Sequence, residues 1–484
     1  MKLWYKKYRK ELALIIGIII TTGFYFLNPF AVDAKANLVL ALAILMISWW
    51  VLEAMPLAVV ALLPLVLFPL LHINSIKETS KVYSDPIIYL FMGGFFLGIA
   101  IEKWNLHKRI ALNIIKITGT NGDKIILGFI LSTGFLSMWL SNTATAMMMY
   151  PIAASVIQVI SRHANSNANT ANFSFTLMLS VAYASNFGGI ATIIGTPPNV
   201  AYVRHLNEHY KHGIDFLNWM MLCMPLAIVL LYVLYLVLVK WLYPNHLSHS
   251  IDGKIFIESE LKEMGALSRQ EKRVLAVFCS TAFLWITKDI INSTQQIFQL
   301  DDSIIALTGA ISLFMVPSGR SKAEPDERLL EWGDTKKMAW GILLLFGGGI
   351  ALAKSLEEAK LMESLGNYIA SFATGNILLL IFVVTLISVF LSEVMSNIAQ
   401  VIVMAPVISA VADALHINPL LLGIPMTLGA SCACMLPMGT PPNAIVFASG
   451  HIKLGEMIKA GFILNLICVV LITLFCWLLV PVLM

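Results

Sequence analysis

Two short clusters of hydroxyl and amide side chains interrupt apolar runs of this sequence. Each holds two serines four residues apart and then an asparagine: Ser137, Ser141 and Asn142 in one, Ser392, Ser396 and Asn397 in the other. The spacing places both serines of a cluster on one helical face. In apolar surroundings, such groups must be satisfied by protein, water or a ligand. A single cluster is typical of hydrogen bonding between neighbouring helices. Its recurrence in the second half favours a binding site for an ion or a substrate.

A Gly-Thr-Pro-Pro-Asn segment follows each cluster, beginning at Gly195 and again at Gly439. Paired prolines remove backbone donors and push the preceding residue out of helical geometry, so each segment ends a helix inside an apolar run. Unwound backbone exposes carbonyl oxygens, which suit a hard cation such as sodium. A helix that restarts there offers amide hydrogens and a positive dipole end to an anion.

These landmarks belong to an internal repeat. A Gly-rich motif at 91–94 recurs at 346–349. The number of residues between Gly93 and Gly348 equals that between Ser141 and Ser396. The Gly-Thr-Pro-Pro-Asn segments follow in the same order, with a shorter linker in the second half. Duplicated halves whose hydrophobic segments are interrupted at matching places indicate a secondary transporter. The pattern does not decide whether the halves are parallel or inverted.

The elements that position these residues must lie in a lipid bilayer. Of the 484 residues, 58% are hydrophobic and 12% are charged, against about a quarter charged in soluble domains. The clearest apolar blocks, near the length that spans a membrane, are Leu12–Phe30, Ile125–Leu140, Phe216–Val239, Ile377–Leu391 and Phe462–Met484. We therefore expect an all-α polytopic membrane protein. The basic residues before Leu12 predict a cytoplasmic N-terminus, and the net charge of +4 gives no indication of nucleic-acid binding.

Several segments outside the clusters also carry expectations. The short Gly-rich segments Ile87–Ile101 and Trp340–Ala353, each followed closely by charge, predict re-entrant hairpins, with a bent ordinary helix as the alternative. The polar stretch Pro244–Arg273 predicts an amphipathic cytoplasmic arm between the halves, and Arg320–Lys337 a second cytoplasmic loop. The uncharged segment Asn165–Asn172 predicts an outer loop or a mobile linker.

With Ser141-Asn142-Thr143 and both Gly-Thr-Pro-Pro segments, the sequence resembles the divalent anion/sodium symporters, which carry succinate, fumarate, malate and, in some members, citrate. The resemblance covers nearly the whole chain. It implies a first sodium site at Ser137, Ser141, Asn142 and the Gly195 backbone. It implies a second at Ser392, the Met395 backbone, Ser396, Asn397 and the Gly439 backbone. Substrate carboxylates would contact Ser141, Asn142, Thr143, Thr196, Ser396, Asn397 and Thr440.

One position departs from the family pattern, because the second motif ends in Ile398 where the first has Thr143. The missing hydroxyl leaves the sodium ligands intact, while Ile398 would narrow the pocket or favour a different anion. Both Ser-Asn segments lack Arg and Lys, and burial of an uncompensated dianion is very costly. Sodium ions can cancel that charge and so couple the two fluxes.

The resemblance further implies a homodimer with an elevator mechanism, in which a mobile transport domain slides against a static scaffold. The expected parts are scaffold helices at 1–84, the first transport repeat at 85–200, a second scaffold part with the arm at 201–334, and the second transport repeat with the C-terminal helix at 335–484.

We therefore expect a multi-pass protein of the inner (plasma) membrane that imports C4-dicarboxylates with sodium ions. A sodium-independent dicarboxylate exchanger, or a carrier of citrate or sulfate, remains an alternative. An enzyme is disfavoured: His205, Glu208 and His209 match a zinc-protease pattern but lie in a polar loop without an evident third ligand. A proton-driven carrier is disfavoured because the sequence shows no acidic or histidine relay. A channel is disfavoured because the sequence shows no filter motif. The close pair Cys432 and Cys434 favours packing over metal binding.

Overall fold

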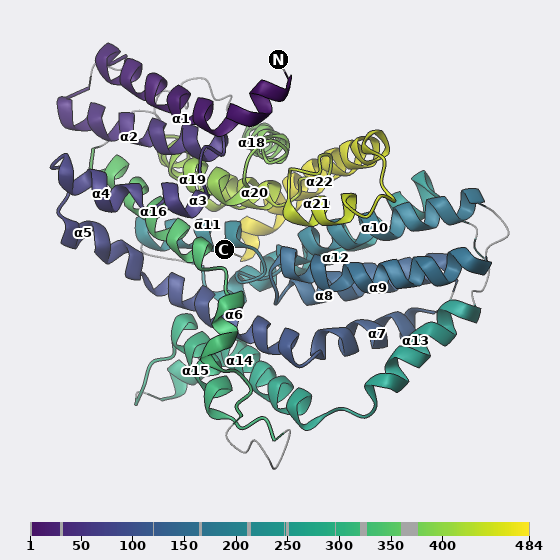
Figure 1. Cartoon of the computed structure of the whole chain (residues 1–484). Helices are drawn as coiled ribbons and strands as arrows, with labels where there is room; N and C mark the ends of the chain where they lie inside the picture. The colour runs from purple at the N-terminus through teal and green to yellow at the C-terminus, as the bar shows by residue number, and fades with distance from the viewer. Residues whose placement is uncertain are drawn as a thin grey trace.

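In a computed structural model of the chain, the described residues are 2–29, 32–119, 121–163, 167–210, 214–245, 247, 251–295, 297–319, 327–359 and 376–483. Within these residues every regular element is helical, and the only extended pairing is an isolated bridge between Pro317 and Arg328. Figure 1 shows the helices stacked in layers, with the first helices of the chain beside the last ones. The all-α architecture expected from the sequence is confirmed.

The helices of the first half end just before the polar arm. They are α1 (Lys2–Leu27), α2 (Ala34–Val51), α3 (Leu57–Val60), α4 (Leu63–Leu70), α5 (Ile76–Lys81), η1 (Val82–Ser84), α6 (Pro86–Lys103), α7 (Leu106–Thr118), α8 (Gly122–Ser137), α9 (Asn142–His163), α10 (Asn167–Gly189), α11 (Pro197–His209), α12 (Phe216–Tyr235) and η2 (Leu236–Leu242).

The arm and the second half follow. Their elements are α13 (Ile251–Met264), α14 (Arg269–Thr294), α15 (Asp302–Met315), η3 (Trp332–Lys337), α16 (Trp340–Glu358), α18 (Ile377–Leu391), α19 (Asn397–Ala414), α20 (Leu420–Ala430), α21 (Pro441–Phe447) and α22 (Leu454–Leu483).

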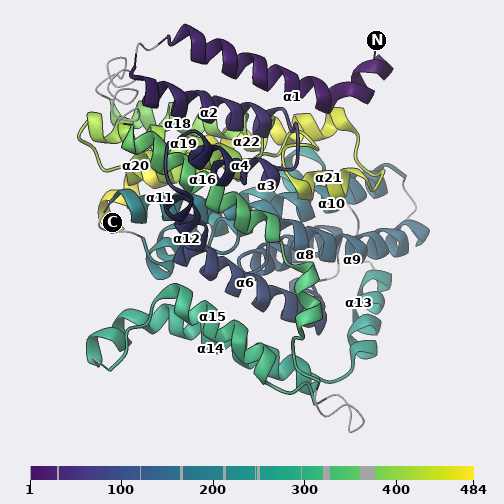
Figure 2. The same cartoon turned by 60° about the vertical axis from the view of Figure 1, so that its left-hand side comes forward.

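Nine of the described helical stretches are long and apolar enough to cross a bilayer. Figure 2 places α1 at one edge of the molecule, outside α2, and α14 with α15 at the opposite edge. Large apolar side chains on these outer helices are exposed, among them Phe26 at 79% on α1 and Phe283 at 62% on α14. Exposed apolar faces of this extent fit contact with lipid rather than water.

The Gly-rich segments do not form the expected hairpins. Each lies in one continuous helix, α6 and α16, and both helices are among the candidate spans. The glycines instead allow helices to pack closely: a Cβ at Gly93 would overlap the backbone of Ala306, and one at Gly348 the backbone of Ala61. Glycine serves tight turns and close backbone approach equally well, so the hairpin prediction was wrong.

Helix breaks occur at the expected places in both halves. The first break separates α8 from α9, which pack against each other in a hairpin (Figure 1), and the equivalent break separates α18 from α19. The second break separates α10 from α11, and its equivalent separates α20 from α21. The halves interlock: α11 packs on α19 and α20, while α21 packs on α9 and α10. Each half therefore helps to enclose the breaks of the other.

The polar segments agree only partly with expectation. The arm contains α13, and Arg109 of α7 anchors it through Glu271 (2.6 Å) and the Gly265 carbonyl (2.9 Å). From Asn167 onward the uncharged segment is the start of α10, so the loop prediction is wrong there, and residues 164–166 lie outside the described part. In the expected second loop, 320–326 are outside the described part as well, and the remainder contains η3.

Candidate functional site

The first Ser-Asn cluster lies at the break between α8 and α9. Ser137 ends α8, and its hydroxyl oxygen lies 2.7 Å from the Ser185 carbonyl and 2.9 Å from Asn142 Oδ1. The single hydroxyl proton can serve only one of these two oxygens. Ser141 Oγ accepts a hydrogen bond from the Ala144 backbone N–H at 3.3 Å, in the manner of an N-cap. The cluster therefore both starts α9 and gathers oxygen atoms.

Gly195 completes this group of oxygens. Asn142 Oδ1 lies 3.3 Å from the Gly195 carbonyl oxygen and 3.0 Å from the Ser185 carbonyl oxygen. If the amide is turned over, its Nδ2 takes this position and donates hydrogen bonds to both carbonyls. A Cβ at Gly195 would lie 2.5 Å from the Gly189 carbonyl, so only glycine fits there. With Oδ1 inward, two side-chain and two backbone oxygens face one another with too few protons to satisfy them. Hard cations prefer such a donor set.

The two Gly-Thr-Pro-Pro-Asn segments restart helices in the same way. Thr196 precedes α11 and Thr440 precedes α21, both with extended backbone. The last residue of each motif clamps its own loop: Asn199 Nδ2 donates to the Thr192 carbonyl at 2.8 Å, and Asn443 Nδ2 to the Leu436 carbonyl at 3.1 Å. The motif made these asparagines visible, but nothing in the sequence assigned them this structural role.

The two Gly-Thr-Pro-Pro-Asn loops are held against the neighbouring Ser-Asn breaks by different groups. In the first half, Thr192 Oγ1 donates to the Met138 carbonyl at 2.5 Å. In the second, the residue aligned with Met138 is Glu393. Its carboxylate accepts hydrogen bonds from the backbone N–H groups of Cys434 (2.8 Å) and Leu436 (2.9 Å). Met435 N–H and Asn465 Nδ2 donate to the same carboxylate at 2.8 and 2.7 Å. All four of these partners are donors, so both carboxylate oxygens act as acceptors.

The second Ser-Asn cluster is less fully bonded than the first. Ser392 is fully buried, and its hydroxyl donates to the Val389 carbonyl at 2.9 Å. Ser396 precedes α19 without a side-chain cap, and Asn397 Oδ1 is buried without a hydrogen-bond partner in the described part of the protein. Met395 is half-buried, and Gly439 is packed beside the Glu393 carboxylate. Ser392, Met395, Ser396 and Asn397 lie at the break between α18 and α19, whereas Gly439 lies at the break between α20 and α21. The unpartnered Asn397 Oδ1 can accept a bond from a ligand.

A chain of polar contacts joins residues of both halves. Asn142 Nδ2 lies 3.4 Å from Thr196 Oγ1 and 3.5 Å from Asn186 Oδ1. Asn186 Nδ2 donates to Thr440 Oγ1 at 3.1 Å. These contacts bring Thr440 to the first cluster, and none among the described residues brings Ser396 there. Asn186 was not predicted, because a single asparagine in an apolar helix without a repeat partner carries no signal.

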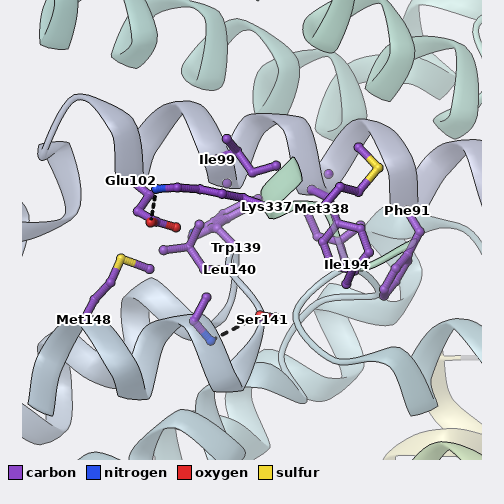
Figure 3. Close-up of a pocket in the computed structure, with 15 residues that line it drawn as sticks. Phe91, Ile99, Glu102, Trp139, Leu140, Ser141, Met148, Ile194, Lys337 and Met338 are labelled. Carbon is purple, nitrogen blue, oxygen red and sulfur yellow. Dashed lines mark hydrogen bonds and ion pairs between the residues drawn. The ribbon is translucent and has the colours of Figure 1, made fainter. Parts of the chain in front are cut away.

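Ser141 also borders a cavity of about 80 Å³ between α6, the first break and residues 337–339. Figure 3 shows Lys337 extended across this cavity to Glu102, and their ion pair measures 2.7 Å. Apart from this pair and Ser141, the lining is apolar, with Phe91 and Trp139 among its members. Thr143, half-exposed on the first turn of α9, makes no side-chain hydrogen bond within the described residues.

The zinc-protease pattern is divided among separate partners. His205 Nε2 lies 2.8 Å from Ser409 Oγ, whereas His209 lies between the carboxylates of Glu357 (3.2 Å) and Asp413 (3.1 Å). Glu208 pairs instead with an arginine one turn earlier on α11. In the described part of the chain, no group of three His, Cys, Asp or Glu residues could hold a metal ion. The side chains of the motif therefore contact separate partners and link helices.

Comparison with known proteins gives a consistent result. Residues 6–484 match the family described as the sodium:sulfate symporter transmembrane region. The sodium-dependent dicarboxylate transporter SdcS of Staphylococcus saprophyticus is 37% identical in an alignment of 479 positions that covers 97% of this chain and 91% of the relative. SdcS of Staphylococcus aureus is 38% identical over 476 residues, with the same coverage.

Two solved structures share the fold. The YdaH transporter of Alcanivorax borkumensis superposes with a TM-score of 0.57 at 11% identity, covering 83% of this chain and 87% of that one. MtrF of Neisseria gonorrhoeae, described among antimetabolite efflux pumps, gives a TM-score of 0.53 at 12% identity, covering 83% of each chain. At this identity the likeness concerns the arrangement of helices alone.

Proposed function

Because this chain belongs to the sodium:sulfate symporter family, we propose that it imports C4-dicarboxylates such as succinate, fumarate and malate together with sodium ions. The family consists of membrane transporters, so the identification made from the sequence motifs is confirmed and an enzyme is excluded. The curated relatives are named sodium-dependent dicarboxylate transporters and match nearly the whole chain. That name supports both the coupling ion and the class of anion.

The observation that carries the proposal is the group of oxygens around Asn142. Ser137 Oγ and the carbonyls of Ser185 and Gly195 lie 2.9, 3.0 and 3.3 Å from the inward atom of the Asn142 amide, and Ser137 Oγ lies 2.7 Å from the Ser185 carbonyl. A sodium ion among them would satisfy every oxygen. The Ser185 carbonyl is an addition to the ligands implied by the sequence. Ser141 Oγ already accepts the Ala144 N–H at the start of α9, so it would bind sodium through its other lone pair.

The second sodium site is assigned to the equivalent break. Its ligands would be Ser392, the Met395 backbone, Ser396, Asn397 and the Gly439 backbone. The buried and unpartnered Asn397 Oδ1 supports this assignment, because an orphaned buried acceptor is costly unless something binds it.

The substrate would lie between the two sodium sites. Its carboxylates would contact polar side chains of both repeats, namely Ser141, Asn142, Thr143, Thr196, Ser396, Asn397 and Thr440. The N-termini of α9, α11 and α19 begin at these residues, and helix N-termini favour negative charge. Neither Ser-Asn segment contains Lys or Arg, so the sodium ions supply the remaining positive charge.

Transport requires one part of the protein to move. We assign 85–200 and 335–484 to a transport domain, and 1–84 with 201–334 to a scaffold that also forms a homodimer. The interlocking of α11 with α19 and of α21 with α9 supports treating the two repeats as one moving body. We place the protein in the plasma membrane with its N-terminus in the cytoplasm.

The test is uptake of labelled succinate into proteoliposomes with and without a sodium gradient. We expect uptake that rises cooperatively with sodium and is not supported by potassium. Asn142→Ala and Asn397→Ala should each abolish uptake, while Asn113→Ala, on an exposed face of α7, should transport normally. Unchanged uptake in sodium-free buffer, driven by internal dicarboxylate, would identify an exchanger instead. Sodium-driven uptake of citrate or sulfate, but not of succinate, would reassign the anion.

A further inference from the structure

Asn186 occupies a position that links the first sodium site to a threonine of the other repeat. It is fully buried on α10, with its Nδ2 3.1 Å from Thr440 Oγ1 and its Oδ1 3.5 Å from Asn142 Nδ2. Aligning Gly195 with Gly439 places Ala430 opposite Asn186. The second repeat therefore has no counterpart of Asn186, so only the first Ser-Asn cluster is linked in this way to a threonine of the other repeat.

The Asn142 amide can take two orientations, which differ by exchange of its oxygen and nitrogen, and each imposes a different pattern of protons on its neighbours. With Oδ1 toward Ser137 and Gly195, a cation is needed among the oxygens, and the two N–H groups point to Thr196 Oγ1 (3.4 Å) and Asn186 Oδ1 (3.5 Å). With Nδ2 toward Ser137 and Gly195, the amide itself satisfies the oxygens at 2.9 and 3.3 Å. Its Oδ1 then faces Thr196 and Asn186 and needs donors from them.

We propose that Asn186 is a positioning residue that couples sodium at the first site to the hydrogen-bonding capacity of Thr440; this rests on the proposed function. When sodium holds Asn142 Oδ1 inward, Asn142 donates to Asn186 Oδ1, and Asn186 donates to Thr440 Oγ1. The Thr440 proton is then free to bind a carboxylate. Thr196, which also receives an N–H from Asn142, is freed in the same way.

Without sodium, both amides take the opposite orientation. Asn142 Oδ1 accepts from Asn186 Nδ2, so Asn186 presents its oxygen to Thr440. A threonine hydroxyl has one proton, and Thr440 must now donate it to Asn186. No donor remains there for the substrate. Sodium binding thus prepares the dicarboxylate site without any movement of the backbone.

Coupling of this kind is reciprocal, so it is measured by binding. In purified protein, we would determine the dissociation constant of succinate at low and at saturating sodium, and that of sodium alone, by calorimetry and ligand-induced thermal stabilisation. The ratio of the two succinate constants is the coupling factor. Asn186→Ala, which installs the residue of the second repeat, should lower that factor about tenfold, the value of one hydrogen bond to a charged group. Sodium affinity without succinate should change less than about threefold, because the ligands around Asn142 remain.

A double-mutant cycle separates the relay from a merely structural role. Thr440→Val removes the proton that Asn186 controls, so this variant alone should lower the coupling factor, and adding Asn186→Ala should lower it no further. Asn186→Leu restores volume if the alanine variant is unstable. Ser180→Ala, buried on the same helix, should leave the factor unchanged.

The outcomes distinguish two failures. If the unaltered protein shows no sodium-dependent succinate binding, the proposed function itself is wrong. If it does, and Asn186→Ala or Thr440→Val keeps the full coupling factor, or the two changes are additive, only the relay is wrong.

Discussion

Glu393 allows the sharpest test of how the second broken segment is held. Its carboxylate receives four hydrogen bonds of 2.7–2.9 Å, three of them from consecutive backbone N–H groups at 434–436. The segment has no helical partners for these donors, so the carboxylate replaces a missing turn. Glu393→Gln keeps the shape of the side chain and removes one acceptor oxygen and the charge.

The magnitude follows from the contacts. Glutamine Oε1 can still accept from Cys434 and Met435, while its Nε2 faces the Leu436 N–H, which loses its acceptor. A buried donor left unpaired costs about 1–3 kcal/mol, and the remaining bonds fall to roughly half strength without the charge. Easier burial of a neutral amide offsets part of this loss. We expect a net cost of about 2 kcal/mol, close to a thirtyfold increase in local opening of the segment.

Hydrogen–deuterium exchange in nanodiscs measures that opening. Peptides covering 431–440 should exchange about thirtyfold faster in Glu393→Gln, and apparent sodium affinity should fall because the Gly439 carbonyl is no longer held. The first-half loop at 190–196 serves as an internal control and should exchange at an unchanged rate. Glu358→Gln serves as the matched control variant, because the Glu358 side chain is 45% exposed and lies 4.0 Å from Lys354. Unchanged exchange at 431–440 would refute the view that this carboxylate holds the segment.

Three further changes test other parts of the structure. Ile398→Thr, which restores the missing hydroxyl, should lower the apparent Michaelis constant for succinate by up to about a hundredfold; altered sodium affinity with unaltered succinate affinity would place residue 398 beside the ion. Gly188→Ala should lower the midpoint of thermal unfolding, because its Cβ would overlap the Gly134 carbonyl, whereas Gly23→Ala, with nothing within 4 Å, should not; equal midpoints would contradict this packing. His209→Ala should cost about 1 kcal/mol or less and leave metal content at background; loss of bound zinc would restore the enzyme hypothesis.

Much of the fold could be predicted because it depends on local properties of the chain. Apolar composition alone placed the chain in a membrane, and the paired prolines after Thr196 and Thr440 had to interrupt helices wherever they were packed. The repeat of Ser-Asn clusters was visible for the same reason, since residue types and spacing survive without coordinates. The Gly-rich segments show the limit: Gly93 and Gly348 allow helices to approach closely, but a sequence cannot tell this use of glycine from a turn.

The candidate site was predictable only one half at a time. The sequence by itself determined that Ser137, Asn142 and Gly195 belong to broken, polar segments, because helix interruption is a property of the backbone within a few residues. Only the tertiary structure brought in the Ser185 carbonyl, set Glu393 beneath 434–436 and placed Asn186 against Thr440. Those contacts join segments far apart in the chain, and their distances depend on how α10 and α21 pack together, which no local pattern of residues encodes.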